Sequence, residues 1–150
     1  MTPAVFDTNV LVAGFLNPHG PPGRIVEWLR NGHVQAVLDD RILLEYTQVL
    51  CRPRFALPVG EVELVLHAIR SRSLGVEATR QARSLPDPDD APFLECAWAA
   101  NVPLVTGNGR HFPRSLAGGA IILTLAQFAA NAAALPQPTV QTRKHFLSGP

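Results

Sequence analysis

The acidic residues of this 150-residue chain are unevenly distributed. Between Ser84 and Gly109 the chain has four acids and neither Lys nor Arg, whereas from Arg110 to the end it has four cations and no acid. Like charges that lie close together cost free energy unless something compensates them. A bound cation would do so, and ligands that are all oxygen atoms favour Mg²⁺ or Mn²⁺. The charge pattern therefore predicts a site for a divalent metal ion.

Two polar residues follow apolar stretches that have the length of buried strands. Asp7 comes directly after Ala4–Phe6, and its alternative role is only to cap the following helix. Asn108 comes shortly after Val102–Val105 and could offer a neutral oxygen atom to a metal ion or to its water. The alternative for Asn108 is an ordinary turn, because Gly-Asn-Gly is a strong turn signal.

Other acids fall within or just before predicted helices. Glu45 lies inside an apolar helical stretch, and a half-buried carboxylate there needs a partner; the alternative is a surface position with an ion pair to Arg41. Asp87, Asp89 and Asp90 lie within four residues of one another. We expect Asp89 or Asp90 to cap the next helix, and the alternative for the group is a solvated acidic turn.

Short apolar strands alternate with amphipathic helices along the chain. The predicted strands are Ala4–Phe6, Val34–Leu38, Leu74–Ala78, Val102–Val105 and Ala120–Leu123. Helices are predicted after Asp7, between Pro22 and Gly32, from Asp39 or Asp40 to about Cys51, over Gly60–Ser73, from Asp89 or Asp90 to about Ala100, and over Leu125–Ala134. This alternation predicts an α/β fold, a three-layer α/β/α sandwich with a central, mostly parallel sheet. Ligands of such folds gather beyond the carboxyl ends of the strands, where Asp7 and Asn108 would lie.

The composition narrows the class of protein. A chain with 47% hydrophobic and 17% charged residues is not disordered as a whole, and a net charge of +1 argues against a general basic coat for nucleic acids. Its length favours one domain, which we place at residues 1–134, followed by a loosely ordered tail at 135–150. No signal peptide and no apolar window of about 18 residues is visible, so we expect a cytoplasmic protein that does not associate with a membrane.

Four segments, in this order, resemble the PIN-domain ribonucleases. They are FDTNVLVAGFL at Phe6–Leu16, ILLEYTQVLCRPRF at Ile42–Phe55, LPDPDDAPFLECAWAA at Leu85–Ala100 and LVTGNGRHFP at Leu104–Pro113. The resemblance extends from about Ala4 to Leu125, and it is greatest to the VapC-like toxin components of toxin–antitoxin pairs. It implies a PIN-like fold and a metal-dependent endoribonuclease.

The resemblance assigns roles residue by residue. It implies that Asp7, Glu45 and Asp90 hold one or two Mg²⁺ or Mn²⁺ ions, with Asp87 as an additional outer ligand. Asn108 falls on the fourth catalytic position, which often holds an Asp in the family, so this chain departs from the family there. This departure puts a second metal ion in doubt.

Four neighbouring residues are expected to support these ligands. Thr8 and Asn9 would fix the geometry around Asp7, and Thr106 would supply a hydroxyl group beside the metal ligands. His111 would hydrogen-bond a phosphate of the RNA, although a histidine in a loop is more often a plain surface residue. The resemblance also implies a cognate antitoxin protein and a homodimer as partners.

Two other functions remain open on the sequence alone. The first is a catalytically weak or inactive PIN-like module that binds RNA or protein, which Asn108 favours slightly. The second is a phosphatase of the haloacid-dehalogenase type, because Asp7 closes the first strand. That chemistry usually needs a second Asp two residues later, where this chain has Asn9.

Overall fold

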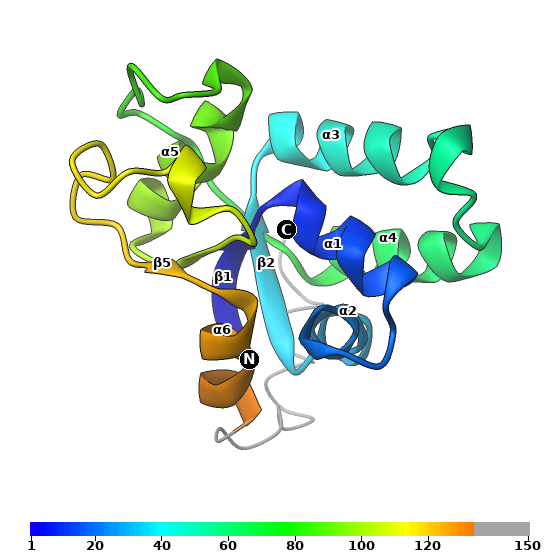
Figure 1. Cartoon of the computed structure of the whole chain (residues 1–150). Helices are drawn as coiled ribbons and strands as arrows, with labels where there is room; N and C mark the ends of the chain where they lie inside the picture. Colours follow the sequence, from blue (N-terminus) through cyan, green and yellow to red (C-terminus); the bar gives the residue numbers. More distant parts are fainter. Residues whose placement is uncertain (134–150) are drawn as a thin grey trace.

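A sheet of five parallel strands, in the order β3-β2-β1-β4-β5, forms the centre of the molecule (Figure 1). The computed structural model describes residues 1–133 of the chain. The strands are β1 (Thr2–Phe6), β2 (Val34–Leu38), β3 (Leu74–Gly75), β4 (Leu104–Val105) and β5 (Ile122–Leu123). The chain builds the sheet from β1 toward β3 and then returns to the other side of β1, so the strand order reverses between β1 and β4.

Helices cover both faces of this sheet, with α5 on one side and α1, α2 and α4 on the other (Figure 1). Their bounds are α1 (Thr8–Leu16), α2 (Pro21–Asn31), α3 (Asp40–Leu50), α4 (Val59–Arg72), α5 (Ala91–Ala100) and α6 (Leu125–Ala133). Three short 3₁₀ turns also occur, η1 (Pro53–Phe55), η2 (Pro88–Asp90) and η3 (Gly109–His111). The prediction of a three-layer α/β/α sandwich with a parallel sheet is confirmed.

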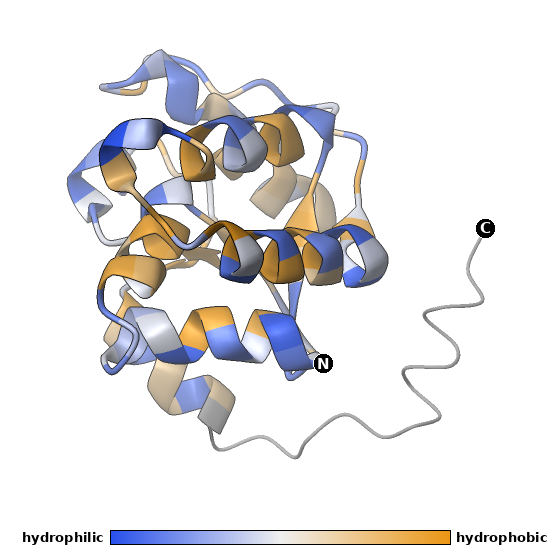
Figure 2. Ribbon diagram, turned by 90° about the vertical axis from the view of Figure 1, so that its right-hand side faces the viewer, coloured by the Kyte–Doolittle hydropathy of each residue, from blue (hydrophilic) through white to orange (hydrophobic). Residues whose placement is uncertain are grey.

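Burial explains why the central strands form where the sequence predicts them. All five residues of β2 are buried, and Ala4, Val5 and Phe6 of β1 have no exposed surface. A parallel strand covered on both faces has to be mostly apolar, and the one polar residue of β2, Gln35, donates its side-chain amide to the carbonyl of Arg72 at 3.1 Å. Helices bury only one face, and apolar and polar residues accordingly alternate along most of them in Figure 2.

The strands β3, β4 and β5 are shorter than predicted, and the edge strand β5 is limited to Ile122–Leu123. The segment predicted as Leu74–Ala78 forms only the two-residue strand β3, because it lies at the edge of the sheet and both of its residues are exposed. On the other side, β4 begins only at Leu104, after Pro103. Proline has no amide hydrogen to donate to a neighbouring strand, although the Pro103 carbonyl still accepts from the amide of Val5 at 2.9 Å.

The last described helix, α6, packs against α2 and the central strand. The ring of Phe128 contacts that of Phe6 edge to face, with 5.3 Å between the ring centroids. The predicted tail at 135–150, and the domain boundary at residue 134, lie outside the described residues. Within the described part, no helix is both long enough and apolar enough to cross a membrane.

The start of α3 is fixed by the side chain of Asp39. One carboxylate oxygen accepts hydrogen bonds from the amides of Arg41 at 3.0 Å and Ile42 at 3.3 Å, so of the two predicted candidates it is Asp39 that caps the helix. The other oxygen accepts from the guanidinium group of Arg41. Burial alone would raise the pKa of Asp39, but these hydrogen bonds outweigh it and lower the pKa below its ordinary value of 3.8.

Replacing Asp39 should separate the cap from the ion pair. We expect Asp39→Ala to lower the free energy of unfolding by about 1 kcal/mol, because it loses both, and Asp39→Asn to lower it by less, because the amide oxygen still caps the helix. The carboxylate has a lowered pKa in the folded state, so its stabilisation is complete above about pH 3.8 and is lost as the pH falls through the folded pKa. Urea unfolding should therefore show the full advantage of wild type over Asp39→Asn at pH 7 and a smaller advantage at each step as the pH is lowered below 3.8.

Candidate active site

The candidate site lies at the carboxyl ends of β1 and β4, where the strand order reverses. Asp7 follows β1, and its amide donates to the carbonyl of Val105 at 3.0 Å. Thr106 follows β4, and its hydroxyl donates to Oδ2 of Asp7 at 2.8 Å. Both side chains are buried. The pairing of the two strands thus brings together residues that are 99 positions apart in the sequence.

Asp7 uses its carboxylate toward β4 rather than as a helix cap. It occupies the position before α1 but makes no capping hydrogen bond to that helix, so the alternative of a plain cap is wrong. Burial raises the pKa of Asp7, and the hydrogen bond from Thr106 and the nearby amides of Asn9 and Thr8 lower it in part. A buried acid with a raised pKa is a frequent property of functional sites.

Glu45 reaches the same region from α3. The hydroxyl of Thr8, next to Asp7, donates to Oε2 of Glu45. Tyr46 is fully buried and its hydroxyl donates to the carbonyl of Phe6, which attaches this turn of α3 to the end of β1. Burial raises the pKa of the half-buried Glu45, and the charge of Asp7 raises it further. The alternative of a Glu45 ion pair with Arg41 is wrong, because Arg41 forms its ion pairs with Asp39 and Glu95.

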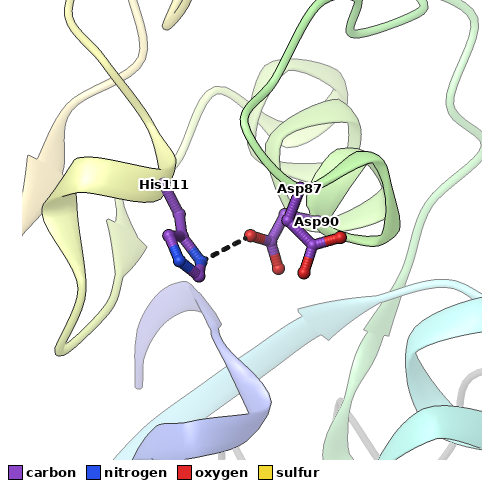
Figure 3. Close-up of side chains that lie close together, drawn as sticks. All are labelled: Asp87, Asp90 and His111. Carbon is purple, nitrogen blue, oxygen red and sulfur yellow. Dashed lines mark ion pairs between the residues drawn. The ribbon is translucent and has the colours of Figure 1, made fainter.

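Asp90 and Asp87 approach from the turn that precedes α5. Asp87 accepts from the amide of Asp89 at 2.9 Å and so caps η2. The prediction that Asp89 or Asp90 caps α5 through its side chain is wrong: Asp90 stands at the capping position but makes no such bond. Its carboxylate lies instead beside His111, with 2.9 Å between Oδ2 and Nδ1 (Figure 3).

Asn108 connects the two halves of the site. Its backbone amide donates to the hydroxyl of Thr106 at 3.0 Å, and its side-chain nitrogen lies 3.0 Å from Nε2 of His111. A continuous series of polar contacts therefore leads from Asp7 through Thr106, Asn108 and His111 to Asp90.

The charges of this region act on one another. The pKa of Asp90 is raised to about 6, first by burial and then by the charges of Asp7 and Asp87, while His111 lowers it in part. Oδ2 of Asp90 is buried and, apart from its ion pair with His111, receives no well-formed hydrogen bond. Carboxylate and imidazole groups are ligands that bind divalent cations. The residues present therefore fit a divalent metal ion.

The side chains of several other polar residues lie apart from these contacts. Asn9 is exposed, so the position where a phosphatase would need its second Asp faces the solvent. The guanidinium of Arg54 lies over the ring of Phe55 at 4.9 Å, which agrees with a packing role. Arg24 stacks on Trp28 and lines a cavity of about 560 Å³ between α1, α2 and α4. None of the predicted metal ligands lines that cavity.

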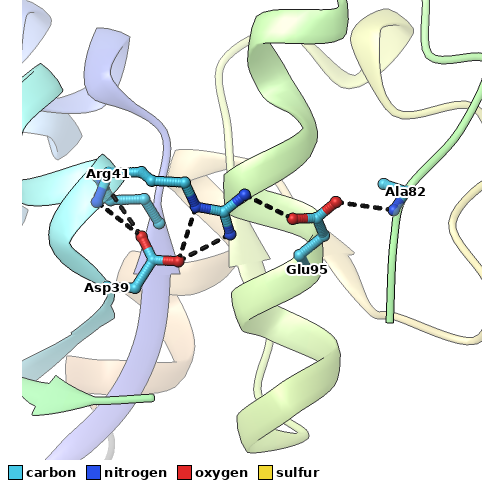
Figure 4. Close-up of polar contacts among 5 residues, drawn as sticks. Asp39, Arg41, Ala82 and Glu95 are labelled. Carbon is cyan, nitrogen blue, oxygen red and sulfur yellow. Dashed lines mark hydrogen bonds and ion pairs between the residues drawn. The ribbon is translucent and has the colours of Figure 1, made fainter. Parts of the chain in front are cut away.

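One polar network was missed in the sequence. Arg41 donates to Asp39 at the start of α3 and, at 2.7 Å, to the buried Glu95 of α5. The second carboxylate oxygen of Glu95 accepts from the amide of Ala82 at 2.9 Å (Figure 4). This network joins the helix that carries Glu45 to the helix that begins after Asp90. The only sequence signal is a single acid in the apolar run APFLECAWAA, which needs a partner.

Removing Glu95 should weaken the fold. We expect Glu95→Ala to lower the free energy of unfolding by about 2 kcal/mol, because it leaves Arg41 and the Ala82 amide without their acceptor. Glu95→Gln keeps a neutral acceptor for one of them, so it should fall between Glu95→Ala and wild type. Glu63→Ala, at an exposed position of α4, is the control and should unfold like wild type. Urea unfolding measures all three, and equal stability of Glu95→Ala and wild type would contradict a structural role for the network.

Comparison with known proteins agrees with this geometry. Residues 3–110 match the PIN domain family. The chain is also similar to an uncharacterized protein of Methanocaldococcus jannaschii, with 25% identity over 107 residues that cover 69% of each chain. No solved structure matches the sequence. PIN domains are generally nucleases that bind RNA and use divalent metal ions. The matched segment spans the whole sheet except β5 and includes Asp7, Glu45, Asp90 and Asn108, so the chain belongs to the PIN domain family.

Proposed function

We propose that this protein is an endoribonuclease that hydrolyses phosphodiester bonds of RNA with the help of Mg²⁺ or Mn²⁺. One observation carries the proposal: at the strand-order reversal of a PIN domain, the charge of Asp7 acts on the ionisation of two carboxylates that come from separate segments. The charge of Asp7 raises the pKa of both Glu45 and Asp90. These charges are close enough to repel a phosphate group, so an RNA substrate requires a cation among them.

We assign the metal to Asp7, Glu45 and Asp90, with Asp87 as an outer ligand. A divalent ion bound there makes a water molecule easier to deprotonate and stabilises the negative charge that develops on the phosphate. The chain itself keeps the ligands in place. Thr106 holds one carboxylate oxygen of Asp7, and Thr8 holds one of Glu45.

Neutralising a single ligand should abolish cleavage. We expect Asp7→Asn, Glu45→Gln and Asp90→Asn each to lower the rate on a fluorescent single-stranded RNA by more than about 100-fold, because even partners of metal ligands commonly contribute 10–100-fold. Asp40→Asn makes the same chemical change at an exposed position of α3 and should cleave like wild type. Thermal melting shows whether each variant is folded. A folded Asp7→Asn variant that cleaves at the wild-type rate would mean that the nuclease activity comes from elsewhere.

A second candidate function is an inactive PIN-like module that binds RNA or protein. Asn108 supports it, because an amide stands where an acid is often found in the family, and an amide binds a metal ion more weakly than a carboxylate. Purified protein with Mn²⁺ distinguishes the two. A nuclease shortens the labelled RNA, whereas the module retards it in a native gel and leaves its length unchanged.

We further propose that the chain is the cytoplasmic toxin of a toxin–antitoxin pair and forms a homodimer. Both ideas rest on the resemblance to VapC-like proteins. Induced expression in a bacterial host should stop growth, and expression of Asp7→Asn should not. Co-expression of the product of the neighbouring short gene should restore growth if that product is the antitoxin. Light scattering of the purified protein should give twice the mass of a single chain, and a monomer at micromolar concentration would contradict the dimer.

A further inference from the structure

We propose that His111 is itself a ligand of the metal ion, through Nδ1 and together with Asp87 and Asp90, and that Asn108 holds its imidazole ring in the ligating orientation. The inference deepens the proposed nuclease function and rests on it. It gives His111 a place in the metal site instead of a contact with the RNA phosphate. It also gives Asn108 a role that does not require it to bind the metal.

The first support is the distance between the ligand atoms. Asp87, Asp90 and His111 each offer one ligand atom, and these atoms all lie within 4.8 Å of one another (Figure 3). Nδ1 of His111 and Oδ2 of Asp90 are 2.9 Å apart. Adjacent ligands of an octahedral ion with bonds of about 2.1 Å are roughly 3 Å apart, so these two atoms already have the separation of neighbouring ligands.

The second support is the state of Asp90. The residue is only 8% exposed, and apart from the contact with Nδ1 of His111 its buried Oδ2 has no hydrogen-bond partner in the described part of the chain. A buried carboxylate oxygen left in this condition costs free energy unless a cation or a hydrogen-bond donor reaches it. His111 is its neighbour, so an ion bound at Asp90 Oδ2 also meets the imidazole nitrogen.

Asn108 controls which nitrogen of His111 is available. Its side chain lies 3.0 Å from Nε2, and the oxygen and nitrogen of an amide group can exchange places by a turn of the side chain. When the amide oxygen accepts from Nε2–H, the proton of the neutral ring is on Nε2, and Nδ1 presents its lone pair to the metal. Metal-binding histidines usually donate their second N–H to a fixed acceptor in this way. The backbone of Asn108 is itself held by Thr106.

A nitrogen ligand has a consequence for the choice of metal. Mn²⁺ also takes mainly oxygen ligands, but as a transition-metal ion it accepts an imidazole nitrogen more readily than Mg²⁺, which prefers a coordination shell of oxygen atoms. The site should therefore bind Mn²⁺ more tightly than Mg²⁺, and the difference should depend on His111. A site built from carboxylates alone would not lose its preference for Mn²⁺ when His111 is replaced.

Pulsed electron paramagnetic resonance of the Mn²⁺-loaded protein, without RNA, tests the inference directly. Wild type should show coupling of Mn²⁺ to a ¹⁴N nucleus, and His111→Ala and His111→Gln should lose it. Calorimetry should show Mn²⁺ affinity reduced by about 10–100-fold in both variants and by about tenfold in Asn108→Ala, with a smaller change for Mg²⁺. His67→Ala, at an exposed position of α4, is the matched control and should keep both coupling and affinity.

The result also separates this inference from the proposed nuclease function. If wild type binds Mn²⁺ without nitrogen coupling while Asp7→Asn still loses RNA cleavage, the ligand role of His111 is wrong and the nuclease function stands. If wild type binds no Mn²⁺, both are wrong. The spectrum of wild type decides the ligand role by itself, so the conclusion does not depend on whether either His111 variant folds.

Discussion

The pairing of β1 with β4 is the constraint on which the rest of the site depends. The hydrogen bond from Thr106 to Asp7 forms because of this pairing. Both strands run in the same direction, so their carboxyl ends lie at one edge of the sheet. The strand order reverses between them, and α1, which follows β1, and α5, which precedes β4, lie on opposite faces of the sheet (Figure 1). This opens the end of the sheet to side chains from other segments. Glu45 on α3 and Asp90 before α5 enter from the two helical layers, and neither could meet Asp7 in another strand order.

Gathering acids at this edge has a cost that the rest of the fold has to offset. Burial raises the pKa values of Asp7, Glu45 and Asp90, and the charge of Asp7 raises those of Glu45 and Asp90 further, so ionising these groups without a cation costs free energy. A cation relieves the same repulsion, and for that reason a metal ion that binds there also stabilises the folded chain. The acid at the start of α3 differs from the site acids. Asp39 is neutralised by Arg41 and serves the fold.

The contacts of Asn108 and His111 suggest how the site adapts to the loss of an acid. An amide at position 108 carries no charge to attract a cation, but it can orient a neighbouring ring. His111 comes three residues later, at the end of η3, where the turn directs its ring back toward Asp90. In the proposed metal site, Asn108 and His111 together take the place of one charged ligand. Such a replacement lowers the negative charge of the site without leaving the carboxylates unpartnered.

The sequence by itself determined the layers of the fold and the residues at the ends of β1 and β4. Apolar runs and helical periodicity reflect the burial of individual residues, so the sandwich and the order and approximate places of its elements could be predicted. The edge strand β3 was predicted too long, because the residue types of a segment do not show whether it lies at the edge of a sheet. Only the tertiary structure decided that Arg41 bridges to Glu95 and that Asp90 faces His111 instead of capping its helix. These choices depend on which side chains the packed layers bring within 3 Å of one another, and sequence spacing does not encode that distance.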